Sequence, residues 1–290
     1  MRIRTTVAAL SGVLALSAFA VPAAQADVQG TVSIDKPSAQ ERFGGSSARS
    51  GFAAQAAPEV SNVTVNAGKA LVFGTTTVRT FEVSLTASHP SGIVDAYMDL
   101  WHGTDPENDI DGYLPPNEEA ATCTAISATT STCKLTITAS PGLHGDGVGE
   151  LYANALAGTW HVTAAALSAD GEVYANDFYK THKVQRLAKL TTDAAPEPVN
   201  AGQTISVTGK LTRADWETGK YVGLSGQALH LQFRESGASA YATVKGIKST
   251  TGGAAKTTTT ATVDGHHRLS YPGISSTAQA VATGDYVGVR

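Results

Sequence analysis

Carboxylate side chains are concentrated in one stretch of this 290-residue chain. Between Thr80 and Cys133 there are nine Asp and Glu residues and no Lys or Arg. Six of the nine fall within fifteen residues, from Asp105 to Glu119. Carboxylates at this density repel one another, and a bound cation would remove that repulsion. Oxygen ligands without cysteine or clustered histidine favour Ca²⁺ over zinc.

The spacing of these acids resembles a calcium-binding loop. Counted from Glu107, the sequence reads E-x-D-x-D-G-x5-E, which is similar to the EF-hand loop and its glycine-enabled turn. Gly112 would supply that turn. The expected Ca²⁺ ligands are Glu107, Asp109, Asp111, the carbonyl of Tyr113 and Glu118, with Asp105 or Glu119 as substitute ligands.

Three departures from the EF-hand pattern limit this interpretation. Glu107 stands where the motif has Asp, Pro115 and Pro116 occupy the start of the exiting helix, and the flanking sequence favours strands. The sequence therefore predicts an isolated calcium loop between strands. A solvated acidic turn and an acidic patch that docks another protein remain open as alternatives.

The chain has only two cysteines, Cys123 and Cys133, both in Thr-rich sequence that favours strands. In an exported protein such a pair predicts one disulfide, here across a hairpin. A redox or metal-binding thiol pair would require C-x-x-C-like spacing or histidine ligands nearby.

Residues 94–101 alternate strictly and predict a half-buried strand. Asp95, Tyr97, Asp99 and Trp101 share the polar face. Asp95 and Asp99 would lie about 13 Å apart, too far for the paired carboxylates of a glycosidase. Tyr97 and Trp101 could stack on a sugar, or could pack beneath a neighbouring loop.

Signatures of catalysis are otherwise lacking in the sequence. The Gly223-Leu-Ser-Gly226 segment lacks the complete G-x-S-x-G pattern, and there is no H-E-x-x-H. His266 and His267 are adjacent, so on a strand they would point to opposite faces, and the other six histidines are scattered. We therefore expect a protein that is not an enzyme, with a hydrolase as the less favoured alternative.

Short strands separated by turn residues account for most of the remaining pattern, and no segment shows a capped helical stripe. The sequence predicts an all-β protein with two immunoglobulin-like β-sandwich domains in tandem. Expected strands include residues 79–86, 134–139, 159–165 and 179–184, then 205–209, 229–233, 241–248, 257–263, 268–271 and 285–290.

The N-terminus has the pattern of a secretory signal peptide over residues 1–26. Arg2 and Arg4 precede an apolar run over residues 7–21, and Ala24-Gln25-Ala26 forms the cleavage site. We expect a flexible leader over residues 27–57 and sandwiches over 58–187 and 188–290. The net charge changes from −4 to −6 in the mature chain, with 19 Lys and Arg against 25 Asp and Glu.

The second half of the chain resembles a known kind of domain. The sequences at 210–215, 229–234 and 265–273, with the closing Gly284-Asp-Tyr-Val-Gly-Val-Arg290, are similar to bacterial immunoglobulin-like modules of actinobacterial secreted proteins. The chain as a whole is similar to exported two-sandwich proteins from such bacteria, some of which carry a calcium-binding label. The resemblance implies architecture more strongly than function, because such modules have many roles.

These observations predict a secreted, extracellular, non-enzymatic protein that binds Ca²⁺ through its acidic loop. The alternative is a binding or adhesion module, including inhibitor-like roles, for cell wall, glycan or another exported protein. Charged residues make up only 16% of the chain and no basic face is evident, which argues against a nucleic-acid partner. We also expect no membrane anchor, because no second apolar segment follows the signal peptide.

Overall fold

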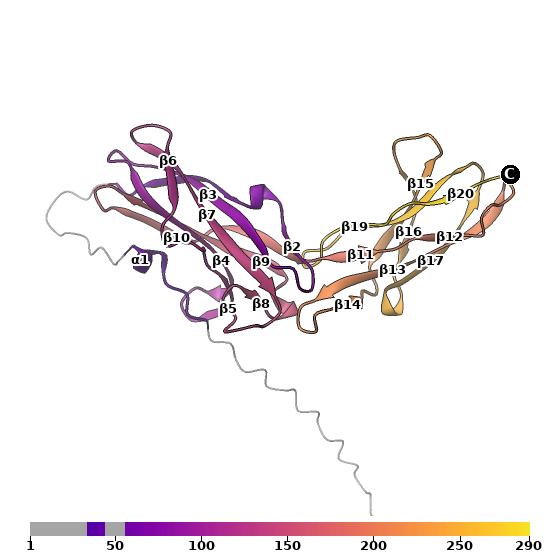
Figure 1. The fold of residues 1–290 in the computed structure, drawn as a ribbon, viewed down its shortest axis with the longest axis horizontal. Helices are drawn as coiled ribbons and strands as arrows, with labels where there is room; N and C mark the ends of the chain where they lie inside the picture. The colour runs from indigo at the N-terminus through magenta and orange to yellow at the C-terminus, as the bar shows by residue number, and fades with distance from the viewer. Residues whose placement is uncertain (1–33, 44–55) are drawn as a thin grey trace, which may run out of the picture. The chain divides into compact units, whose positions relative to one another are not determined.

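The computed structural model describes residues 34–43 and 56–290. The predicted signal peptide and most of the predicted leader lie outside the described residues. Within the described ranges, strands form nearly all of the regular structure (Figure 1). The exceptions are α1 (Ala39–Arg42) and the 3-10 turns η1 (Asn66–Gly68), η2 (Asn154–Leu156) and η3 (Thr251–Gly253). None of the helices described is long and apolar enough to cross a membrane.

The first sandwich consists of two sheets whose strands have the order of an immunoglobulin domain, A-B-E-D in one and G-F-C-C′ in the other. The first sheet contains β1 (Glu59–Val65), β3 (Arg79–Ser88), β7 (Thr130–Pro141) and β6 (Thr122–Ala125), with β8 (Glu150–Leu151) beside β7. The second contains β2 (Leu71–Phe73), β10 (Val173–Arg186), β9 (Gly158–Ser168), β4 (Ile93–Asp105) and β5 (Asp109–Leu114).

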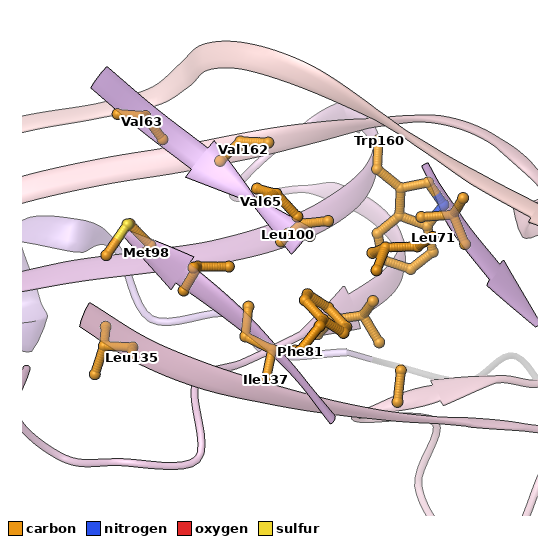
Figure 2. Packing of buried hydrophobic residues seen from close by; sticks show 14 of the residues in the cluster. Val63, Val65, Leu71, Phe81, Met98, Leu100, Leu135, Ile137, Trp160 and Val162 are labelled. Atoms are coloured by element: carbon orange, nitrogen blue, oxygen red, sulfur yellow. The ribbon is translucent and has the colours of Figure 1, made fainter. Parts of the chain in front are cut away.

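The core of this sandwich lies between the two sheets, where inward side chains alternate along each strand (Figure 2). Each large apolar side chain buried there stabilises the fold by about 1.5–3 kcal/mol. The buried cluster includes Val63, Val65, Leu71, Phe81, Met98, Leu100, Leu135, Ile137, Trp160 and Val162.

The second sandwich has a core of its own, which includes Ile205, Val207, Leu229, Leu231 and Leu269. One sheet contains β11 (Ala188–Leu190), β12 (Asp193–Ala195), β13 (Gln203–Asp215), β14 (Lys220–Gly223) and β17 (Ala254–Ala261). The other contains β15 (Ala228–Glu235), β16 (Ala242–Lys248), β18 (Gly265–Tyr271), β19 (Ala280–Val281) and β20 (Asp285–Val287). The predicted tandem of immunoglobulin-like sandwiches is confirmed.

The predicted disulfide is also confirmed. Cys123 and Cys133 face each other across the β6–β7 hairpin and are bonded, at a sequence separation of ten. Cys133 is fully buried in the first core, so the bond ties a surface strand to the interior.

Replacing both cysteines, as Cys123→Ala with Cys133→Ala, should lower the free energy of unfolding by about 2–3 kcal/mol, because the unfolded chain regains the freedom of an open loop. Denaturant unfolding of both proteins measures the difference. The reduced wild type should unfold at a denaturant concentration close to that of the variant. Equal midpoints for the oxidised wild type and the variant would contradict this expectation.

Candidate functional site

Strand β4 is buried on both of its faces. Ala96, Met98 and Leu100 point into the sandwich core, as the alternation predicts. Tyr97 and Trp101, predicted as a ligand-binding face, are 2% and 0% exposed. The outward face is therefore covered, which agrees with packing beneath a neighbouring segment rather than with a free sugar-stacking surface.

Trp101 is covered by two aromatic rings, and we call Trp101, His161 and Phe178 the aromatic patch. The β4–β9 register sets Trp101 opposite His161, whose ring stacks on the indole at 4.4 Å between centroids. Phe178 meets the indole edge-on at 5.0 Å and His161 at 4.9 Å. The Phe178 side chain remains 51% exposed and His161 is partly exposed, so Phe178 is the most accessible ring of the three.

An irregularity in β10 places Phe178 and its neighbour Asp177. The β10–β9 register shifts between Asn176 and Lys180, so extra residues bulge out of the ladder. The Trp101 indole N–H donates to the Asp177 carbonyl at 2.8 Å and holds the bulge against β4. Sequence patterns did not reveal either residue, because a bulge breaks the alternation used to assign faces.

Beside the aromatic patch lies the lysine–aspartate cluster, formed by Lys36, Asp99 and Asp177. Lys36 Nζ lies 2.5 Å from Asp177 Oδ1 and 3.5 Å from Asp99 Oδ2. The Tyr97 hydroxyl donates to Asp99 Oδ2 at 2.9 Å, and the Thr163 hydroxyl donates to Asp177 Oδ1 at 3.1 Å. Lys36 was not identified from the sequence, because its surroundings have no periodicity.

Residues 34–43 therefore pack on the sheet, which corrects the prediction of a flexible leader for this part of it. Phe43 packs against Tyr97, and the Arg42 guanidinium lies over the Tyr97 ring at 5.4 Å. Arg42 also donates to the carbonyls of Glu118 and Glu119 at 3.1 and 2.5 Å. A lysine, an arginine and an aromatic ring thus fasten a segment whose composition alone resembles a linker.

The acidic segment begins with the turn of the β4–β5 hairpin. The Asp105 carboxylate accepts the backbone N–H groups of Glu107 and Asn108 at 2.9 and 3.3 Å. These bonds, the Glu107 bond foremost, lower the pKa of Asp105 below its ordinary value. Asp109 accepts a hydrogen bond from the Thr104 hydroxyl. The carboxylates at the tip thus stabilise the turn itself.

Gly112 does not form the predicted calcium-loop turn but lies within strand β5. A Cβ atom there would come within 2.7 Å of the Trp160 ring, so glycine is required by packing. Neighbouring Asp111 pairs with His102 Nδ1 at 2.5 Å, and this hydrogen bond is the leading cause of a lowered pKa at Asp111. The Tyr113 carbonyl accepts the Gly149 N–H at 2.8 Å.

Glu118, the predicted final ligand, is bonded to the opposite sheet. Its carboxylate accepts the backbone N–H and the hydroxyl of Thr136, in β7, at 2.8 and 2.6 Å. Pro116 bridges to Ile137 in the same strand, so the chain continues extended instead of entering a helix. Throughout the part of the chain that the structure describes, no three His, Cys, Asp or Glu side chains are grouped to hold a metal ion.

Burial changes the protonation of the outward row of β4. Desolvation raises the pKa of Asp99 to about 6, and the charge of Lys36 opposes the rise. Desolvation, followed by the charge of Asp99, raises the pKa of Tyr97 far above its ordinary range. Asp99 can therefore exchange a proton near neutral pH, whereas Tyr97 remains a hydrogen-bond donor.

No protein-family model matches the chain, and no curated protein is significantly similar to it in sequence. Among solved structures, the chain is similar to three N-terminal domains of the Hoc outer capsid protein of bacteriophage RB49, at 11% identity and a TM-score of 0.30, over 80% of this chain and 70% of that one. It is also similar to the adhesin InvE of Yersinia pseudotuberculosis, at 14% identity and a TM-score of 0.26, over 76% of this chain and 56% of that one. The D00-D0 domain of intimin matches at 13% identity and a TM-score of 0.25, over 78% of this chain and 99% of that one. The immunoglobulin-like assignment rests on the strand order of the first sandwich, and the second is likewise a pair of sheets around a core of its own.

The pKa of His161 provides a test of the aromatic patch. Desolvation, with the nearby His102 adding to it, lowers this pKa below the ordinary value of 6.5, and a hydrogen bond with the Gly103 backbone opposes the shift. Between the lowered value and 6.5 the unfolded chain binds more protons than the folded chain. The wild type should therefore lose stability, relative to His161→Phe, as the pH falls through about 6.5.

Unfolding free energies of both proteins at about pH 7.5 and about pH 5.5, on either side of the ordinary histidine value, measure this change. His161→Phe keeps a stacked ring and removes the titrating nitrogens. If the difference in unfolding free energy between the two proteins is the same at both pH values, the pKa of His161 is not lowered by its place in the aromatic patch.

Proposed function

We propose that this chain is an exported, non-catalytic binding module that holds an extracellular ligand on the aromatic patch. The observation that carries the proposal is the Phe178 ring, 51% exposed and held by edge contacts to Trp101 and His161. The disulfide and the predicted signal peptide support export.

The Phe178 ring is the part of the patch that a sugar or a peptide would contact, because Trp101 beneath it is buried. Aromatic rings provide a large apolar contact at little entropic cost, because they have few rotatable bonds. His102 and Asp111 supply polar groups next to it, and His102 also lies against Trp160 at 5.5 Å between ring centroids. Since strands carry all of these side chains, the surface is already ordered before a ligand arrives. Cell-wall glycan is the ligand class we favour, with another exported protein as the alternative.

Phe178→Ala should weaken binding to isolated cell walls by about tenfold or more, because a central aromatic anchor contributes upwards of 1.4 kcal/mol to binding. Co-sedimentation with walls over a range of protein concentrations measures the affinity. The matched control is Tyr286→Ala in the second sandwich. Tyr286 is 44% exposed and lies edge-on to a histidine, His266, at 5.2 Å, as Phe178 does to His161.

Equal affinities for wild type and Phe178→Ala would remove the aromatic patch from the proposal. A loss in Tyr286→Ala alone would move the binding surface to the second sandwich. Repeating the assay with a calcium chelator separates this function from the calcium hypothesis, since the aromatic patch itself requires no metal.

Calcium binding at the acidic hairpin is the second candidate function. Its support is the tip of the β4–β5 hairpin, where Asp105, Glu107 and Asp109 lie within five residues and no cation is paired with them among the described residues. Binding there would require Asp109 to give up its hydrogen bond from Thr104. We therefore expect a weak site, with a dissociation constant of about 10⁻⁴–10⁻³ M. Calcium dissociation constants of that order are usual for extracellular modules.

For this candidate we expect a measurable heat and a rise in melting temperature with about 5 mM Ca²⁺, which is several times the weak-site constant. Asp105→Asn combined with Glu107→Gln and Asp109→Asn should abolish both effects. Glu59→Gln combined with Glu82→Gln, two exposed acids on the other sheet, is the control and should respond as the wild type does. If the wild type gives neither heat nor a shift, the chain is not a calcium-binding protein.

A further inference from the structure

The lysine–aspartate cluster holds a buried amine in contact with a partly buried carboxyl group. The side chain of Lys36 is 1% exposed and that of Asp99 is 0% exposed, while Asp177 is 24% exposed. Lys36 Nζ lies 2.5 Å from Asp177 Oδ1, so the amine is already against the carboxyl group that it would attack. Thr163 donates to the same oxygen and fixes the orientation of the carboxyl group.

Holding this cluster as three charges is unfavourable. It contains two carboxylates and one ammonium, so one negative charge has no counterpart within the cluster. Asp99 Oδ1 is buried without a hydrogen-bond partner among the described residues, although a buried carboxylate ordinarily has both oxygens satisfied. Removing ions from water is unfavourable, so an uncharged arrangement of the same groups is favoured.

We infer that Lys36 and Asp177 become joined by an amide bond that the protein forms on itself, with Asp99 carrying the protons. Lys36 Nζ, as the free amine, attacks Cγ of Asp177 in its acid form. A C–N bond forms, a C–O bond of the carboxyl group breaks, and that oxygen leaves as water. Starting from the ion pair, the Lys36 ammonium loses two protons, and both end on the oxygen that leaves as water. The step therefore requires no oxidant, reductant or other reactant.

Asp99 is placed to act as the general acid and base of this step. It lies 3.5 Å from Lys36 Nζ and receives the Tyr97 hydroxyl on the same oxygen, which leaves Oδ1 free to take a proton. Burial raises its pKa to about 6, close to the range in which a proton carrier is most effective. Folding already brings the amine and the carboxyl group together, so the reaction itself does not bear the entropy cost of bringing them into contact.

The position of the bond in the chain indicates its consequence. Lys36 precedes β1 and Asp177 lies in β10, the last strand of the first sandwich, 141 positions later. A covalent link between them closes nearly the whole first sandwich into one loop. Tension applied to the chain outside this loop would then pass through the amide rather than through the strand ladders. Such a bond suits an exported module that holds a surface.

Mass spectrometry of tryptic peptides from the full chain tests the inference directly. Trypsin should cut after Arg42, Lys134 and Lys180, whereas Pro37 protects the bond after Lys36. The expected product is the peptide that ends at Arg42 joined to peptide 135–180, with a mass one water below their sum. Two separate peptides at their unmodified masses would overturn the proposal, and Lys36 would then be a partner in an ordinary ion pair.

Substitutions identify the role of each group. Lys36→Arg keeps the positive charge and should give no linked peptide, while Lys183→Arg, an exposed lysine in the same strand as Asp177, should leave the link intact. Asp99→Asn keeps both reacting groups and should slow linkage by about 10²-fold or more, as loss of a general acid–base does. Linkage at the wild-type rate in Asp99→Asn would overturn the role of Asp99.

The readout is covalent, so it does not depend on wall binding. The wild-type protein alone decides whether the bond forms, even if a variant folds poorly. If the wild type is linked but Phe178→Ala binds walls normally, the amide inference stands and the proposed wall-binding function is wrong. If the peptides are unlinked but wall binding depends on Phe178 as expected, the amide inference is wrong and the proposed function stands.

Discussion

The buried carboxylate of Asp99 is the constraint around which the first sandwich is arranged. The alternation of β4 sends Asp99 to the outer face of a sheet, where it is fully buried although the sandwich core lies on the other side. A buried carboxylate is stable only with a counter-charge and hydrogen-bond donors. Lys36 and Tyr97 supply them, and the need for Lys36 explains why residues 34–43 lie on this sheet.

Covering the outer face divides it into a closed half and an open half. On the closed half, Arg42 and Phe43 lie over Tyr97. On the open half, Phe178 and His161 lie over Trp101 but remain accessible to solvent themselves. The β10 bulge joins the two halves, because Asp177 faces the lysine–aspartate cluster while the Phe178 side chain is exposed to solvent.

The acids from Asp105 to Glu119 have a spacing similar to that of a calcium loop, but several of them accept hydrogen bonds that stabilise the fold. In an EF-hand, ligands alternate around a loop that enters a helix. Here the Asp105 carboxylate accepts hydrogen bonds within its own turn, Asp111 bonds to His102 in β4, and Glu118 accepts from Thr136 in β7 of the other sheet. The prolines keep the chain extended after β5, so the last acid reaches β7. Of these acids only Asp105 belongs to the hairpin tip, with Glu107 and Asp109, on which the calcium hypothesis now depends.

Local pattern in the sequence determined the all-β class, most strands, the tandem sandwiches and the disulfide, because alternation, turn residues and cysteine number act over short distances. The alternation also placed Tyr97, Asp99 and Trp101 on one face. Only the tertiary structure decided that this face is covered, because the residues that cover it come from a segment without periodicity and from a bulge in β10. Contacts such as Lys36 with Asp177 join positions 141 apart. No local pattern carries that information, since it arises only when sheet pairing brings distant residues together.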